Sequence, residues 1–298
     1  MAGGFFRKWF GGAPPVLSPE VEQALAELQK LEKNRPHLAE PIQVLSAVVP
    51  HLYGAPIRTL VPSLTPDQAR AKLTAGVPLL QGENFQIDQA AFQERWQQVC
   101  EALQKNHPDD LGRKLLDGLR QGKLDPGMLL GDVLAGRTDA IQQTVAALGL
   151  DTGLATIVVR LLLVPVLSPV NAGWQPLRQG VPWKKGYCPT CGNWPLLGEA
   201  PGQQQEIRHF RCSLCNAAWE FPAQVCPFCD EADASFLGSF TPDGAEPGFW
   251  AATCLACHGY IKMMATAVPL NGPRLLIADL ISMDLDLAAA EHGFAVPG

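Results

Sequence analysis

Four pairs of cysteines constrain the fold of this chain most strongly. In each pair two residues separate the cysteines, a spacing that lets one tight turn direct both sulfurs at a single metal ion. One such pair is weak evidence for a metal site, whereas four pairs within residues 188–257 are strong evidence. The predicted metal ligands are Cys188, Cys191, Cys212, Cys215, Cys226, Cys229, Cys254 and Cys257.

The residue that follows each pair supports a shared turn geometry. A turn that folds the chain back over a metal ion needs a backbone with positive φ, which Gly, Asn, Asp and His tolerate best. The four positions are Gly192, Asn216, Asp230 and His258. We therefore predict that all four pairs form the same kind of turn.

The lengths between the pairs indicate how the pairs combine. Twenty residues separate the first pair from the second and twenty-four separate the third from the fourth, and both segments read as strand, turn, strand. Only ten residues lie between the second and third pairs. A hairpin in each long segment would join the first pair with the second and the third with the fourth. This predicts two tandem β ribbons of the zinc-ribbon or rubredoxin kind, with an interleaved pairing as the alternative.

Four thiolates suit zinc or iron, and a closed set of four leaves no position for substrate or water. A structural or electron-storing role is therefore favoured over hydrolysis. The stretch "CLACH" from Cys254 also matches a haem-attachment motif. That use would leave Cys226 and Cys229 without partners, so His258 is better interpreted as a turn residue. A thioredoxin-like pair is disfavoured because no pair precedes a convincing amphipathic helix.

The half of the chain before the cysteine pairs is predicted to be helical. Ser18 and Thr65, each followed by proline, are typical helix starts. Apolar residues recur along one helical face at Phe92, Trp96, Val99 and Leu103, with Cys100 beside them as an expected buried thiol. Residues 154–170 are expected to form one buried helix, and residues 171–187 a linker rich in proline and glycine.

The fold class is therefore α+β and multidomain. We expect a helical domain over residues 1–175, a first four-cysteine ribbon over 176–222, a second over 223–270, and a C-terminal helix with a tail over 271–298 that packs back. The last helix should share one apolar face, formed by Leu276, Leu280, Met283 and Leu287.

Charge and hydropathy exclude several classes of function. The net charge is −6, and residues 176–270 hold six basic and eight acidic residues, so a nucleic-acid partner is not expected. The N-terminal stretch "FFRKWF" is interpreted as a frayed end or a strap on a domain. We expect no signal peptide, because the first residues lack an apolar segment of the required length. Arg160 and Pro165 interrupt the longest apolar run. We therefore expect a cytoplasmic protein without stable membrane insertion, in which cysteines stay reduced.

Beyond the cysteine spacing, five segments carry a family resemblance: "CPTCGNWP", "RHFRCSLCNAAWEF", "CPFCD", "CLACHGYIK" and "ADLISMDLDLAAAEHG". In these segments the chain resembles the formate dehydrogenase accessory protein family (FdhE). The resemblance covers about residues 186–293. It implies a cytoplasmic assembly factor, not an enzyme, that binds the catalytic subunit of a molybdenum-type formate dehydrogenase before export. It also implies two rubredoxin-type iron ions, one in each group of four cysteines, with zinc as the alternative occupant.

Two other functions stay open at this stage. A rubredoxin-like electron carrier or thiol redox protein would use the same cysteines, and a ribbon-type nucleic-acid binder is less favoured because of the charge balance. The sequence does not indicate which surface binds a partner, and it leaves a homodimer open.

Overall fold

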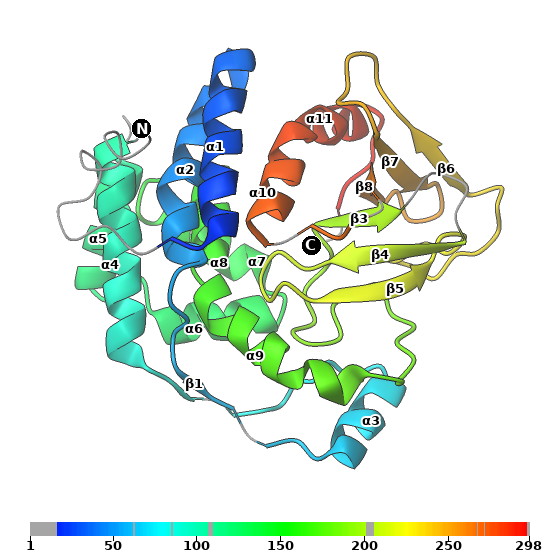
Figure 1. Ribbon diagram of the computed structural model, residues 1–298, viewed down its shortest axis with the longest axis horizontal. Coiled ribbons are helices and arrows are strands. Elements are labelled where there is room, and N and C mark those ends of the chain that lie inside the picture. The colour runs from blue at the N-terminus through cyan, green and yellow to red at the C-terminus, as the bar shows by residue number, and fades with distance from the viewer. Residues whose placement is uncertain are drawn as a thin grey trace. The chain divides into compact units, whose positions relative to one another are not determined.

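The computed structural model describes residues 17–61, 63–84, 86–106, 110–200, 206–266, 268–270 and 272–296. The chain divides into two compact units (Figure 1). The helical unit comprises the described residues of Met1–Leu60 and Phe85–Pro169, and the ribbon unit those of Val61–Asn84 and Val170–Gly298. The predicted N-terminal strap, residues 5–10, lies outside the described residues.

Helices dominate the helical unit, and the first of them begins where the sequence indicates. The hydroxyl of Ser18 accepts a hydrogen bond from the Val21 N–H at 3.4 Å, and Pro19 opens the first helix. The predicted apolar face is confirmed because Phe92, Trp96, Val99 and Leu103 are all fully buried. The elements are α1 (Pro19–Asn34), η2 (Pro36–Leu38), α2 (Ala39–Leu52), β1 (Thr59–Leu60), β2 (Gln86–Ile87), α4 (Gln89–Asn106), α5 (Leu111–Arg120), α6 (Pro126–Leu134), α7 (Thr138–Ala146) and α8 (Thr152–Leu161).

The expected single helix over residues 154–170 is wrong in one respect. The chain forms two helices there, α8 and α9 (Val164–Arg178), which are bent by 45° relative to each other. Pro165 lies in the first turn of α9, where a missing N–H costs nothing. Helix α9 also takes up the first eight residues of the expected linker, since Val170, Asn171 and Trp174 give this polar-looking stretch a buried face.

Among the described helices, none is by itself long and apolar enough to cross a membrane. Helices α8 and α9 pass such a test together, on length and composition alone. Both carry many buried residues, as core helices do.

The ribbon unit contains one six-stranded sheet in the order β5-β4-β3-β8-β7-β6. Each predicted ribbon supplies an antiparallel meander of three strands, and the meanders join through parallel pairing of β3 with β8. Gly198 faces Met263 at this junction, where a Cβ on Gly198 would lie only 2.5 Å from the Met263 sulfur. The strands are β3 (Leu197–Ala200), β4 (Ile207–Arg211), β5 (Ala218–Pro222), β6 (Leu237–Phe240), β7 (Phe249–Cys254) and β8 (Tyr260–Ala265).

The two ribbons, expected over residues 176–222 and 223–270, are thus joined in one continuous sheet. This joining was not expected from the sequence. The ribbon unit also takes in α3 (Pro66–Thr74), which lies far earlier in the chain. Thr65 caps α3 as predicted: its hydroxyl and the side chain of Gln68 form a reciprocal capping box. Independent folding of each expected range stays a prediction.

The C-terminal segment packs back onto the sheet as two helices, α10 (Gly272–Ile281) and α11 (Met283–Glu291). Their apolar residues Leu275, Ala278, Leu285 and Ala289 share one buried cluster with residues of β3, β7 and β8. The prediction of one C-terminal helix with a single apolar face is therefore wrong. The helix breaks at Ser282, whose hydroxyl donates to the Ala278 and Asp279 carbonyls, and the break leaves Met283 and Leu287 exposed.

Candidate metal centres

All four cysteine pairs form the same turn. The backbone N–H of each first cysteine donates to the carbonyl five residues later, at 2.8–3.0 Å. The residue after each second cysteine has positive φ, as predicted: 81° at Gly192, 57° at Asn216, 60° at Asp230 and 54° at His258. The last three are the only non-glycine residues with positive φ in the described chain. This use of a rare conformation shows that the turns are built to one design.

The turns bring the cysteines together in two groups of four, in the arrangement that the hairpins predict and not in the interleaved one. Site 1 contains Cys188, Cys191, Cys212 and Cys215, and site 2 contains Cys226, Cys229, Cys254 and Cys257. Within each site the four sulfurs all lie within 4.8 Å of one another.

The sulfur separations fit a tetrahedral metal site. In site 1 the Cys188 and Cys215 sulfurs are 3.4 Å apart and the Cys191 and Cys212 sulfurs 3.6 Å apart. The corresponding pairs in site 2 are 3.6 Å and 3.7 Å apart. A regular tetrahedron with zinc–sulfur bonds of about 2.3 Å has edges of about 3.8 Å. These cysteines are all free thiols, so no disulfide explains their proximity.

The chemistry of the donor set also fits a cation. Four thiols this close cannot all ionise on their own, because each thiolate opposes the ionisation of its neighbours. In site 1, hydrogen bonding with Cys188 lowers the pKa of Cys212 and raises the pKa of Cys191 far above its ordinary value. A divalent or trivalent ion would remove this conflict. The sites could hold either zinc or iron.

Site 1 is enclosed by protein. Its four cysteines are at most 3% exposed. The backbone N–H groups of Leu79 and Leu80 donate to the carbonyls of Pro189 and Thr190, both at 2.9 Å. The Thr190 hydroxyl in turn donates to the buried amide oxygen of Asn171 at 2.9 Å. Residues 76–80 precede the first cysteine pair by more than a hundred residues, and nothing in their sequence indicates that they cover it.

Site 2 reaches the surface. Cys226 and Cys254 are buried, but Cys229 is exposed and Cys257 is partly exposed. Leu255, between the cysteines of the fourth pair, is 53% exposed. Other segments contact the turns of site 2 as well: the Leu255 N–H donates to the Phe236 carbonyl at 2.8 Å, and the Ala295 N–H donates to the His258 carbonyl at 2.9 Å. These contacts leave Cys229 and Cys257 accessible. The difference in access between two otherwise similar sites was not expected from the sequence.

Cys100, the ninth cysteine, has no part in either site. It is fully buried in α4, as predicted, and burial raises its thiol pKa to about 12. A thiol that stays protonated at neutral pH is neither a good nucleophile nor a good ligand. It is therefore a core residue.

These features define a class: a helical unit followed by a sheet that carries two four-cysteine sites. Residues 187–222 match the family described as FdhE, central domain. Over 109 residues the chain is 33% identical to an FdhE homologue of Stutzerimonas stutzeri, covering 36% of this chain and 35% of that protein. It is 27% identical to the FdhE protein of an Escherichia coli strain over 115 residues, 38% of this chain and 36% of that protein.

The crystal structure of the FdhE protein from Pseudomonas aeruginosa shares the fold. The match has a TM-score of 0.50 and covers 93% of this chain and 92% of that one, at 22% sequence identity. Together these likenesses confirm the resemblance to the FdhE family. The sequence matches span about a third of the length of the curated relatives. The matched residues include the first four-cysteine site.

Proposed function

We propose that this protein is an accessory factor in the maturation of a formate dehydrogenase. It would bind the catalytic subunit of a molybdenum-type enzyme in the cytoplasm, before export, and would not itself catalyse a reaction. The observation that carries the proposal is the pair of complete four-cysteine sites on an FdhE-like fold. The link to formate dehydrogenase comes from the family resemblance.

Each site would hold one metal ion, iron by family resemblance and zinc as the alternative occupant. All eight cysteines would be ligands, with no position left for substrate, which supports an accessory role rather than an enzymatic one. Metal analysis and an absorption spectrum of protein purified without oxygen test this part. Two ions per chain are expected, and ferric iron held by four thiolates would be coloured whereas zinc would not.

Partner binding needs a separate experiment. Tagged protein should retain the catalytic subunit of a formate dehydrogenase from a cell extract, and purified components should then form the complex again. Sedimentation of the free protein would show at the same time whether it is a monomer or a homodimer. Failure of the purified components to bind at micromolar concentrations would contradict the accessory function.

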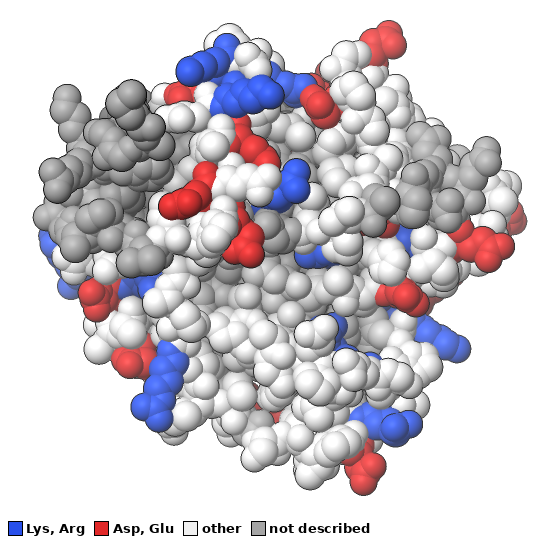
Figure 2. All heavy atoms as spheres, viewed as in Figure 1, with Lys and Arg blue, Asp and Glu red and all other residues white. Residues whose placement is uncertain are grey.

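A rubredoxin-like electron carrier is the second candidate, and the exposure of Cys229 and Cys257 favours it because electron transfer needs a metal near the surface. Reversible reduction of site 2 and steady electron transfer to a purified acceptor would support this role. A nucleic-acid partner has less support: Figure 2 shows basic and acidic side chains interspersed on one face of the molecule.

A further inference from the structure

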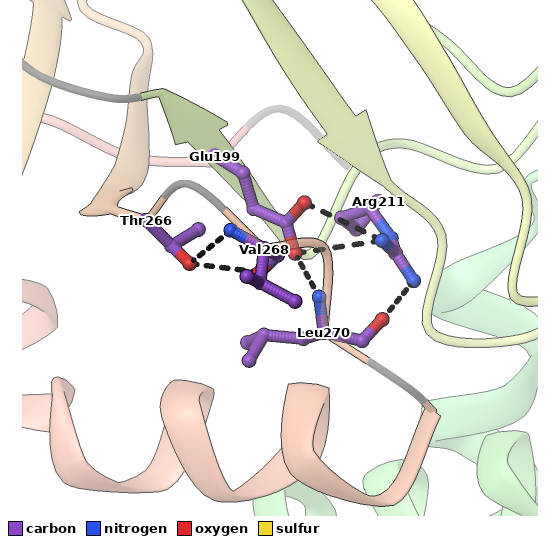
Figure 3. A network of polar contacts seen from close by, with 5 residues as sticks. All are labelled: Glu199, Arg211, Thr266, Val268 and Leu270. Carbon is purple, nitrogen blue, oxygen red and sulfur yellow. Dashed lines mark hydrogen bonds and ion pairs between the residues drawn. The ribbon is translucent and has the colours of Figure 1, made fainter.

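Three groups of polar contacts, which we call anchors, hold the C-terminal segment on the sheet. The first ribbon supplies one anchor and the second ribbon supplies two. The first anchor belongs to the first ribbon (Figure 3). The Glu199 carboxylate accepts a hydrogen bond from the Leu270 N–H at 2.9 Å and pairs with Arg211 at 3.4 Å. Arg211 donates in turn to the Leu270 carbonyl. This buried network holds the chain just before α10 begins.

The second anchor belongs to β8, the strand that follows the fourth cysteine pair. Lys262 is 5% exposed, and its ammonium group pairs with Asp279 of α10 at 2.5 Å and with Asp286 of α11 at 2.7 Å. The Tyr260 hydroxyl donates to the second carboxylate oxygen of Asp286 at 2.7 Å. Asp286 therefore joins α11 to two residues of the strand that leaves site 2.

The third anchor is the turn of site 2 itself. The Ala295 N–H donates to the carbonyl of His258 at 2.9 Å, and the Tyr260 N–H donates to the carbonyl of Ala295 at 3.3 Å. The His258 carbonyl is held in place by the positive-φ turn that directs Cys254 and Cys257 at the metal site. The chain end is thus bonded to a backbone whose conformation depends on two of the candidate ligands.

We propose that site 2 is a labile metal site whose ion keeps α11 and the chain end docked on the sheet. Exposed Cys229 and partly exposed Cys257 give a competing ligand access, so site 2 loses its ion before buried site 1. Loss of the ion frees the turn at His258 and loosens the start of β8. Residues 283–296 then leave the sheet, while Glu199 and Arg211 of the first ribbon still hold the chain before α10. The proposal rests on the metal binding proposed above, but not on the formate dehydrogenase partner.

Release would uncover an apolar surface. Leu285 and Ala289 of α11 pack in the cluster that contains Phe249, Ala251 and Tyr260 of the sheet. Without α11 these sheet residues would lose their cover. The metal state of site 2 would thereby control whether an apolar face of β7 and β8 is covered.

The test uses the full chain loaded with zinc and treated with EDTA. Native mass spectrometry counts the ions, and hydrogen–deuterium exchange reports the protection of each segment. We expect one ion to leave about tenfold faster than the other, as local opening near a surface is easier than opening of a buried site. Amide exchange should rise in residues 283–296 as that first ion leaves, while β3, β4 and the start of α10 stay protected.

A reciprocal test does not depend on cysteine variants that fail to fold. Asp286→Asn weakens the contact of α11 with Lys262 and Tyr260, and Asp284→Asn on the same helix is the matched control. If the metal stabilises docking, docking stabilises the metal by the same factor. Asp286→Asn should therefore weaken binding of the first ion several-fold, which we expect to appear as its faster loss to EDTA, and should leave the second ion unchanged. Asp284→Asn should match the wild-type protein.

Several results would overturn the proposal. Loss of both ions at one rate would contradict a labile second site, and unchanged protection of residues 283–296 after loss of the first ion would contradict the coupling. So would faster loss of the ion from site 1 in Asp286→Asn. Starting protein with no bound ion would overturn the proposed metal binding itself, and its mass before EDTA treatment identifies that case.

Discussion

The two four-cysteine sites have the same turns but different surroundings. Each uses two Cys-x-x-Cys turns with a positive-φ residue after the second cysteine, and each joins them through an antiparallel hairpin. Site 1 is covered by residues 76–80 and has no exposed cysteine, whereas two cysteines of site 2 reach the surface. Local sequence determines how the four cysteines of each site are arranged, and distant segments determine how exposed those cysteines are to solvent.

This difference suggests a division of labour. A buried site of four thiolates stabilises the fold, since binding of a structural zinc ion contributes about 10–16 kcal/mol to folding. A site with accessible ligands exchanges its ion more readily and responds to its surroundings. The experiments below test this division, from the largest expected effect to the smallest.

The largest difference is expected between Cys212→Ser and Cys229→Ser. Cys212 is fully buried, so its replacement should abolish metal binding at site 1 and unfold the first ribbon, at a cost on the order of 10 kcal/mol. Cys229 is exposed, so water can replace its sulfur as a ligand. Cys229→Ser should weaken metal binding at site 2 and leave β3, β4 and β5 protected from hydrogen exchange. Equal loss of protection in the two variants would contradict the division of labour.

The cover of site 1 can be opened with Leu79→Ala. Leu79 is fully buried and adjoins the backbone pairing that covers Pro189, so truncation should destabilise the ribbon unit by about 3 kcal/mol. It should also speed metal loss from site 1. Leu255→Ala beside site 2 is the matched control, because this leucine is 53% exposed and its truncation should change stability by about 0.5 kcal/mol or less. Denaturant unfolding and rates of metal loss to a chelator check both expectations.

Acid should weaken the metal sites because it protonates their thiolates. In the helical unit, acid should instead reduce stability through His51. Burial, reinforced by Arg95, lowers the pKa of His51 from 6.5 to about 4. Between these values the unfolded chain binds a proton that the folded chain does not, so lowering the pH favours unfolding. The loss is complete below pH 4 and amounts to at most about 3 kcal/mol.

His51→Asn removes this titration. The free energy of unfolding of the helical unit should therefore fall less in the variant than in the wild-type protein between pH 7 and pH 4.5. Hydrogen exchange in α2 and α4 follows that unit separately from the metal sites. An identical pH dependence in the two proteins would show that His51 is not a source of acid instability.

Much of the candidate site could be predicted from the sequence because its determinants are local. The residue types at Gly192, Asn216, Asp230 and His258 indicate positive φ, and the segment lengths between pairs indicate the two hairpins. Helix starts at Ser18 and Thr65 are likewise determined by a few adjacent residues. These local features favour the observed grouping of the cysteines over the interleaved alternative.

The rest depends on contacts between distant residues. Parallel pairing of β3 with β8 needs the fit of Gly198 against Met263, 65 positions apart. Neither the cover of site 1 nor the pairing of Lys262 with Asp279 and Asp286 has a local signature. The break at Ser282 was missed because the apolar spacing continues across it, although the serine hydroxyl bonds back to the preceding turn.

The smallest effect tests whether the turns of the two sites are equivalent. At positions 216 and 258 an alanine and a glycine variant both lack the native side chain, so their difference reports the backbone alone. Alanine in the left-handed conformation costs about 1 kcal/mol more than glycine. Asn216→Gly should therefore be more stable than Asn216→Ala by about that amount, and His258→Gly than His258→Ala by the same amount, in denaturant unfolding of zinc-loaded protein. A stability difference between the alanine and glycine variants at position 216, with none at position 258, would contradict the equivalence of the turns. It would mean that the turn of site 2 can relax its backbone and the turn of site 1 cannot. The two sites would then differ in their turns as well as in their surroundings.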